Sequence, residues 1–173
     1  MAACAFCRIA YGEAAARIVW SSADAIAFLP LSPATRGHTL VVPRQHVPDL
    51  WSVDRQLGSS LMAAVVEVGQ AIREALYPDG MNLISSAGAA ASQTVFHLHL
   101  HLVPRWREDR IGAIWPPSEP WSEAELDDVA ERIRAASSRR LLLKGTDEDQ
   151  DKPDEGKDPV ERQQRPRKRR GPP

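Results

Sequence analysis

The sequence predicts an α+β fold, and three observations lead to this prediction. Short segments rich in β-branched and aromatic residues are separated by turn residues. One longer segment repeats apolar residues at helical spacing. Three of the five histidines alternate with leucines, as side chains alternate between the two faces of a strand. With 173 residues and a hydrophobic fraction of 43%, the chain is long enough for one substantial core and a tail.

Three strands are expected near the N-terminus, over residues 19–20, 25–29 and 39–42. A turn over residues 21–24 joins the first two strands, Pro30 ends the second, and Pro43 closes the third. The longest helix is expected from a cap at Ser52 to about Tyr77. Its apolar residues are spaced for one helical face: Leu57, Leu61, Val65, Val68, Ile72 and Leu76.

A fourth strand is expected at residues 81–85, and a loop of small residues at 86–92 leads into the strand that carries the histidines. Further on, Ser122 and Glu125 have the spacing of a capping box, which predicts a last helix reaching about Arg139. Residues 144–173 are rich in charge, proline and glycine and have few apolar residues, so a disordered tail is expected there, after a domain at 1–143.

Composition excludes several classes of protein. A net charge of -1 makes neither nucleic acid nor an anionic membrane an obvious partner. The chain has no apolar run long enough to span a bilayer, and its N-terminus lacks the features of a signal peptide. Two cysteines without an export signal indicate a cytoplasmic protein with reduced thiols.

The histidine-bearing strand is the main candidate for chemistry. Alternation places His97, His99 and His101 on one face, and the intervening leucines on the other. Imidazoles titrate near neutral pH and bind metals or anions, so a cluster of three suggests a functional site. An exposed metal-binding array and a half-buried strand with a polar face are the alternatives.

Several motifs in the same order resemble the histidine triad (HIT) family, named for alternating histidines and apolar residues. They are Cys4-x-x-Cys7-x-Ile9, Gly12-Glu13, Phe28-Leu29, the run from Arg36 to His46, Met81-Asn82 and the run from Gly88 to His101. The resemblance covers residues 4–140. It implies a HIT-like antiparallel sheet of about five strands, and a homodimer. A dimer would also cover part of the long apolar helix face.

The resemblance further implies a nucleotidyl hydrolase or transferase that cleaves at the α-phosphate of a nucleoside phosphate. His99 matches the nucleophile, which forms a covalent nucleotidyl-histidine intermediate. His101 would hold a phosphate oxygen, and the Thr94 hydroxyl could pass a proton. Matching phosphate or substrate contacts come from His38, from the loop around Gln93, and from Ser86, where many relatives have asparagine. Phosphoramidates, adenylated compounds and dinucleoside polyphosphates are the candidate substrates.

A structural zinc ion is also implied by the resemblance. Its ligands would be Cys4, Cys7, His46 and His97, a set that suits a closed tetrahedral site. The alternatives for the two cysteines are buried apolar residues and a redox pair. Without metal, His97 would instead join the phosphate pocket as a third hydrogen-bonding histidine.

The sequence departs from the family at two further positions. Pro30 stands where many relatives have an acidic or amide residue that binds the ribose hydroxyls, and proline has no side-chain acceptor. Ser92 replaces a common glycine, which adds a Cβ where the backbone needs unusual angles. After the triad, Arg105, Arg107 and Arg110 either meet a polyphosphate or form a solvated basic loop.

Two other functions compete with the enzyme. One is a non-catalytic, zinc-stabilised nucleotide-binding or scaffold protein, which Pro30 and Ser86 favour. The other is a protein that binds nucleic acid through the basic residues 165–170, which we rank last because an acidic stretch precedes them.

Overall fold

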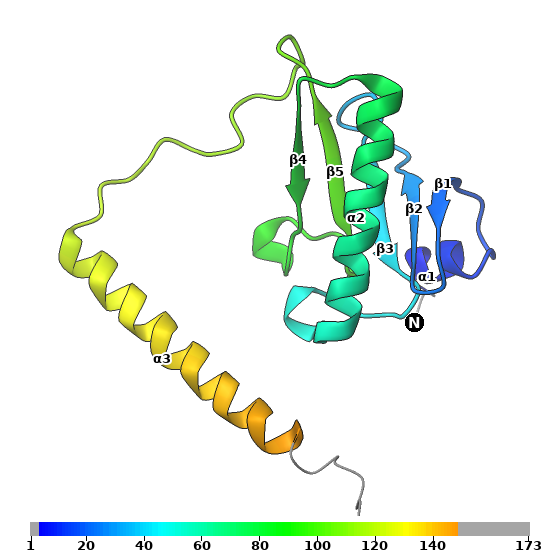
Figure 1. Ribbon diagram of the computed structural model, residues 1–173. Helices are drawn as coiled ribbons and strands as arrows, with labels where there is room; N and C mark the ends of the chain where they lie inside the picture. Colours follow the sequence, from blue (N-terminus) through cyan, green and yellow to red (C-terminus); the bar gives the residue numbers. More distant parts are fainter. Residues whose placement is uncertain (1–3, 149–173) are drawn as a thin grey trace, which may run out of the picture. The chain divides into compact units, whose positions relative to one another are not determined.

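The computed structural model describes residues 4–148. Its main element is a five-stranded antiparallel sheet (Figure 1). The strands are β1 (Arg17–Ser21), β2 (Ala25–Leu29), β3 (Thr39–Pro43), β4 (Gly80–Ile84) and β5 (Leu100–Arg105). Their order in the sheet is β1-β2-β3-β5-β4. The predicted α+β class and antiparallel sheet are confirmed. The order places β5, with His101, between β3 and the edge strand β4.

The neighbouring strands β2 and β3 are apolar at almost every position and almost wholly buried. They do not show the alternation of a half-exposed strand because both faces of the sheet are covered there. Ala25, Ala27 and Val41 belong to the larger core, against the long helix. Ile26 and Phe28 point the other way, into a smaller core.

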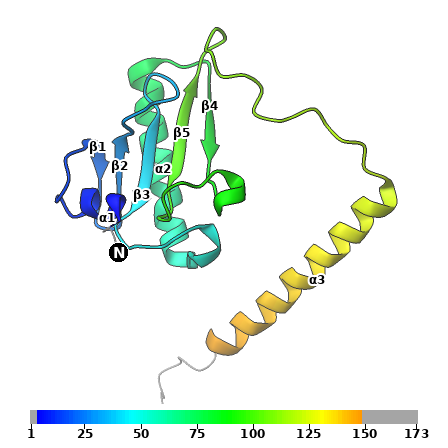
Figure 2. The ribbon, with the colours of Figure 1, turned by 180° about the vertical axis from the view of Figure 1, so that it is seen from behind.

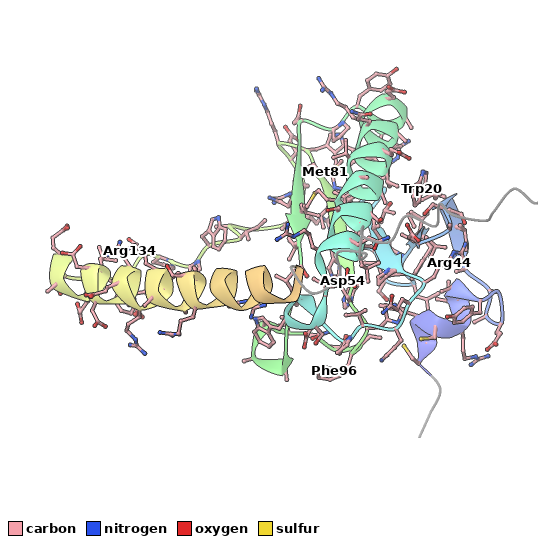
Figure 3. The ribbon with its side chains drawn as sticks, turned by 60° about the horizontal axis from the view of Figure 1, so that its bottom comes forward. Trp20, Arg44, Asp54, Met81, Phe96 and Arg134 are labelled. Carbon is pink, nitrogen blue, oxygen red and sulfur yellow. The ribbon has the colours of Figure 1, made fainter. Side chains whose placement is uncertain are left out.

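The long helix α2 (Arg55–Leu76) lies along one face of the sheet (Figure 1). Five of the six residues predicted from the helical spacing are buried, together with Ala64: Leu57, Leu61, Val65, Val68 and Ile72. The sixth, Leu76, is only partly buried. The predicted cap at Ser52 is wrong. Asp54, labelled in Figure 3 at the start of α2, caps the helix. Its carboxylate accepts a hydrogen bond of 2.8 Å from the Leu57 backbone N–H. Ser52 instead ends a 3₁₀ turn (Leu50–Ser52).

A short helix α1 (Ala5–Ala10), which no helical pattern in the sequence predicts, lies at the opposite face (Figure 2). Phe6 and Ile9 pack against the smaller core, next to Phe28 and Leu40. Six residues offer less than two turns of periodicity, and Cys4 at the cap makes no side-chain hydrogen bond to mark the start. Packing against the sheet therefore decides that this segment is helical.

The histidine segment differs from the prediction, because β5 begins at Leu100 and His97 and His99 precede it. The Leu98 N–H donates to the Val47 carbonyl at 2.6 Å, so the chain bonds here to the segment after β3 and not to a continuing sheet ladder. The expected alternation of faces persists, since Leu98 and Leu102 lie in the larger core.

The described residues form two compact units, which divide between Pro116 and Pro117. The second contains α3 (Glu123–Glu148). Its capping box is confirmed, since the Glu125 carboxylate accepts from the Ser122 N–H at 2.9 Å. The helix continues beyond the predicted end at Arg139 and includes residues 144–148 of the expected tail, while 149–173 lie outside the described residues. Within residues 4–148, no helix is long and apolar enough to cross a membrane.

Candidate active site

Four histidine side chains and one phenylalanine form a row across the sheet face opposite α2. The ring centroids of His38 and His101 are 5.2 Å apart, and those of His99 and His101 are 4.9 Å apart. Phe6 of α1 presents its ring edge-on to His99 at 5.3 Å and to His97 at 5.9 Å. The structure thus brings together the predicted His38, His99 and His101, and adds Phe6, which sequence reasoning missed.

Hydrogen bonds fix which nitrogen of His99 carries the proton. Its Nδ1 lies 2.7 Å from the carbonyl oxygen of His97. A carbonyl oxygen only accepts, so Nδ1 of a neutral His99 must donate. The lone pair is then on Nε2, which is the form that a nucleophilic or metal-binding imidazole requires.

A second chain of hydrogen bonds fixes the tautomer of His101. The backbone N–H of Ala34 donates to Nδ1 of His38 at 3.0 Å, so the proton of a neutral His38 is on Nε2. This Nε2–H donates to Nδ1 of His101 at 2.9 Å. The remaining proton of His101 is therefore on its Nε2, where it can donate to an anion. A donor and a lone pair thus stand on adjacent rings.

Burial favours the neutral form of the His38 and His101 rings. Desolvation, followed by the nearby His99 and His38, lowers the pKa of His101 to about 4. Desolvation also lowers the pKa of His38. Because both rings are neutral near pH 7, His101 would stabilise an anion by hydrogen bonding and not as a cation.

The loop before the histidines is held in an unusual conformation. Gly88 and Ser92 have positive φ angles of 83° and 66°. The strain expected at Ser92 from its place in the sequence is therefore present, because an L-residue rarely adopts this region. Around them lies a 3₁₀ turn (Ala89–Ala91).

The predicted loop residues differ in their surroundings. The buried side chain of Gln93 accepts from the Gly88 N–H at 2.8 Å and donates to the Pro48 and Val95 carbonyls at 2.7 and 3.1 Å. Its amide therefore braces the loop. Thr94 is exposed and Ser86 is half-buried, so their substrate contacts stay predictions.

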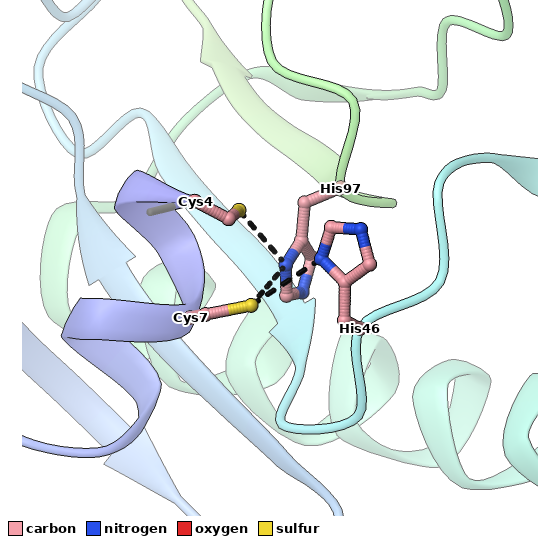
Figure 4. A group of neighbouring side chains, drawn as sticks. All are labelled: Cys4, Cys7, His46 and His97. Atoms are coloured by element: carbon pink, nitrogen blue, oxygen red, sulfur yellow. Dashed lines mark hydrogen bonds between the residues drawn. The ribbon is translucent and has the colours of Figure 1, made fainter. Parts of the chain in front are cut away.

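Cys4, Cys7, His46 and His97 form a cluster whose candidate ligand atoms all lie within 4.8 Å of one another (Figure 4). Three separate segments supply them, since both thiols come from α1 and its cap. The His97 Nε2–H donates to the Pro43 carbonyl at 2.9 Å, so Nδ1 carries the lone pair and faces both thiols at 3.5 Å. His97 is fully buried and points to this cluster and not to the phosphate pocket.

The cluster has the dimensions of a tetrahedral metal site. Bond lengths of about 2.3 Å to sulfur and about 2.0 Å to nitrogen would place neighbouring ligand atoms about 3.5 Å apart. The distances from the Cys7 sulfur are 3.3 Å to Nδ1 of His46 and 3.5 Å to Nδ1 of His97. Burial, with the Cys4 thiol beside it, raises the pKa of Cys7, so a metal ion would have to displace its proton.

A cavity of about 800 Å³ opens beside the histidine row on the β2 side, and we call it the phenylalanine cavity. Its lining includes Phe6, Phe28, Pro30, Ser32, Leu40 and Thr94. Aromatic and aliphatic walls with a few hydroxyl groups suit a flat organic group that also makes hydrogen bonds. The cavity adjoins His99, because Phe6 contacts both.

The comparisons with known proteins agree with this geometry. The family model of the HIT domain matches residues 11–108, more than half of the chain. The Bacillus subtilis protein named hit is 34% identical over 139 residues, covering 78% of this chain and 96% of that protein. The Arabidopsis thaliana adenylylsulfatase HINT3 is 32% identical over 138 residues, covering 80% and 69% of the two chains. A Zn-bound histidine triad family protein from Mycobacterium smegmatis has a TM-score of 0.61 at 35% identity, covering 78% and 97%.

The depressed pKa of His101 gives a testable pH dependence. Between pH 6.5 and about 4, the unfolded chain takes up a proton at this residue while the folded chain does not. The free energy of unfolding should therefore fall as the pH drops through this window. His101→Gln should flatten the slope there and leave it unchanged above pH 7. Denaturant titrations across the pH range measure both slopes, and identical curves for the two proteins would contradict the prediction.

Proposed function

Because the chain belongs to the HIT domain family, we propose that it is a nucleotidyl hydrolase or transferase that cleaves at the α-phosphate of a nucleoside phosphate. The observation that carries the proposal is the pairing of a free Nε2 lone pair on His99 with an Nε2–H on His101. The first is a nucleophile for phosphorus, and the second is a donor for a phosphate oxygen.

In the first step, the Nε2 lone pair of His99 forms a bond to the α-phosphorus, and the bond from phosphorus to the leaving atom breaks. The leaving atom keeps the electron pair and takes a proton, for which the exposed Thr94 hydroxyl is the candidate relay. In the second step, water attacks phosphorus and loses a proton, and the electrons of the P–N bond return to His99. A nucleoside monophosphate is released.

We assign the nucleoside to the phenylalanine cavity. Phe6 and Phe28 offer aromatic surface to a base, and Ser32 and Thr94 offer hydroxyl groups where Pro30 offers no side-chain acceptor. An adenine base is the first choice, because the Arabidopsis relative is named an adenylylsulfatase.

The nucleophile assignment predicts that His99→Ala lowers turnover of adenosine 5′-phosphoramidate by about 10²-fold or more, the usual cost of removing a catalytic group. The fold should survive, since the core leucines around it are unchanged. Mass spectrometry of wild-type protein mixed with substrate should show an adduct of nucleotide mass on His99, absent from the variant. Turnover within tenfold of wild type would exclude His99 as the nucleophile.

We propose that the Cys4, Cys7, His46 and His97 cluster binds a structural zinc ion. The tetrahedral spacing supports this, as does the Zn-bound relative from Mycobacterium smegmatis. Four protein ligands would leave no open position for water, so the ion would hold the N-terminus to the sheet. Two reduced thiols fit the cytoplasm, which is the location we infer.

Cys4→Ser should remove the metal and lower the melting temperature together, because metal binding is coupled to folding at such a site. Elemental analysis should find one zinc per wild-type chain and none in the variant. His101→Gln, which leaves the four ligands intact, should keep its zinc. Wild-type protein purified without chelator and free of metal would refute the site.

We propose that two copies pair through β4. This strand ends the sheet, so its outer edge offers backbone hydrogen bonds. A groove between α2 and β4 is lined by Val65, Val66, Gly69, Met81 and Leu83, and both Val66 and Leu83 are exposed large apolar residues. A second copy would cover them.

Sedimentation at micromolar concentration should accordingly give a dimer for wild type and a monomer for Leu83→Lys. Val19→Lys introduces the same charge on β1, at the other edge of the sheet, and should remain dimeric. A wild-type monomer, or equal dissociation of both variants, would contradict pairing through β4.

A further inference from the structure

A second cavity, of about 340 Å³, lies on the opposite side of the histidine row from the phenylalanine cavity. We call it the isoleucine pocket. His38 and His101 line it, together with Ile84 of β4, Val103 of β5, and Ile111 and Ile114 from the segment after β5. A phosphorus atom bound at His99 and His101 would therefore have one cavity on each side. A substrate likewise carries two groups on its phosphorus atom, the nucleoside and the leaving group.

The loop that forms the outer wall is fixed by a network centred on Arg105. Its guanidinium donates to the Asp109 carboxylate at 2.6 and 3.0 Å, to Asn82 at 2.8 Å, and to the Ile111 carbonyl at 2.9 Å. The same carboxylate accepts from the Ile111 N–H at 3.0 Å. Ile111 is thus held through both of its backbone polar groups. The position of this wall of the pocket is therefore fixed by hydrogen bonds.

The chemistry of the pocket disfavours an anionic occupant. Its lining contains no lysine or arginine among the residues that the structure describes. Arg105, the cation of this network, is paired with Asp109, whose side chain is only 8% exposed. His38 and His101 are neutral near pH 7 because burial lowers the pKa of both. A polyphosphate would lose its hydration there and gain no counter-charge from the lining residues.

Building on the proposed function, we propose that the isoleucine pocket binds the leaving group of the substrate and selects an apolar one. The substrate class is then a nucleoside monophosphate joined at phosphorus to an alkyl- or aryl-bearing group, and dinucleoside polyphosphates are disfavoured. Ile114 is the specificity-determining residue that we single out, because it is 39% exposed at the mouth of the pocket and its replacement leaves the core intact.

Adenosine 5′-phosphoramidates of methylamine and pentylamine test the proposal, because the two amines are nearly equal leaving groups and differ in apolar length. Burying each methylene is worth about fourfold in affinity. The wild-type protein should therefore favour the pentyl substrate by about tenfold or more in kcat/KM. Diadenosine tetraphosphate should be a poorer substrate than the pentyl compound.

Ile114→Asn should bring the pentyl-to-methyl ratio of kcat/KM close to one, chiefly by lowering kcat/KM for the pentyl substrate. Ile18→Asn is the matched control, because Ile18 is a similarly exposed isoleucine (48%) on β1, and its ratio should equal that of wild type. A melting curve for each variant shows whether it is folded.

The outcomes separate the two proposals. Equal turnover of the methyl and pentyl substrates by wild type, or a preference for diadenosine tetraphosphate, overturns the leaving-group assignment and leaves the nucleotidyl chemistry standing. A ratio that survives Ile114→Asn overturns the role of Ile114. Absence of turnover and of a nucleotide adduct on His99 with every substrate overturns the proposed function, and the leaving-group assignment with it.

Discussion

The arrangement of the site depends on three of the polar groups of His97, which are its two ring nitrogens and its carbonyl oxygen. Its Nε2–H is bonded to the Pro43 carbonyl at the end of β3, and its Nδ1 faces the thiols of Cys4 and Cys7. Its own carbonyl accepts the hydrogen bond that fixes the tautomer of His99. A single buried residue thus contacts the sheet, the N-terminal helix and the candidate nucleophile.

The site has two unlike sides, and separate contacts form each of them. On the β2 side, α1 brings Phe6 to the histidine row and completes the larger cavity. On the β4 side, Arg105 and Asp109 hold the chain that follows β5 against the sheet. The histidines stand between them, and each ring has a neighbour that sets its protonated nitrogen. These hydrogen bonds leave a lone pair on Nε2 of a neutral His99 and a donor on Nε2 of a neutral His101.

Much of the site could be predicted from the sequence because its signals are local. Alternation of histidine and leucine separates a chemical face from a core face wherever the chain is extended. The same rule holds for α2, whose apolar spacing identifies its buried residues. Prediction fails where two local signals compete. Ser52 and Asp54 are both good caps, and only the path of the chain into α2 selects Asp54.

The sequence by itself determined the α+β class and the face on which the triad lies, because residue type and short-range spacing suffice for these. The other candidate site residues came from the resemblance to the HIT family. The tertiary structure decided the rest. Phe6 and His99 lie far apart in the chain, and only the packing of α1 on the sheet brings their rings together. The hydrogen bonds from Ala34 to His38 and from Arg105 to Ile111 join closer residues, but in irregular loops that follow no repeat. No spacing rule relates such partners, because their contact depends on how the sheet and its helices pack.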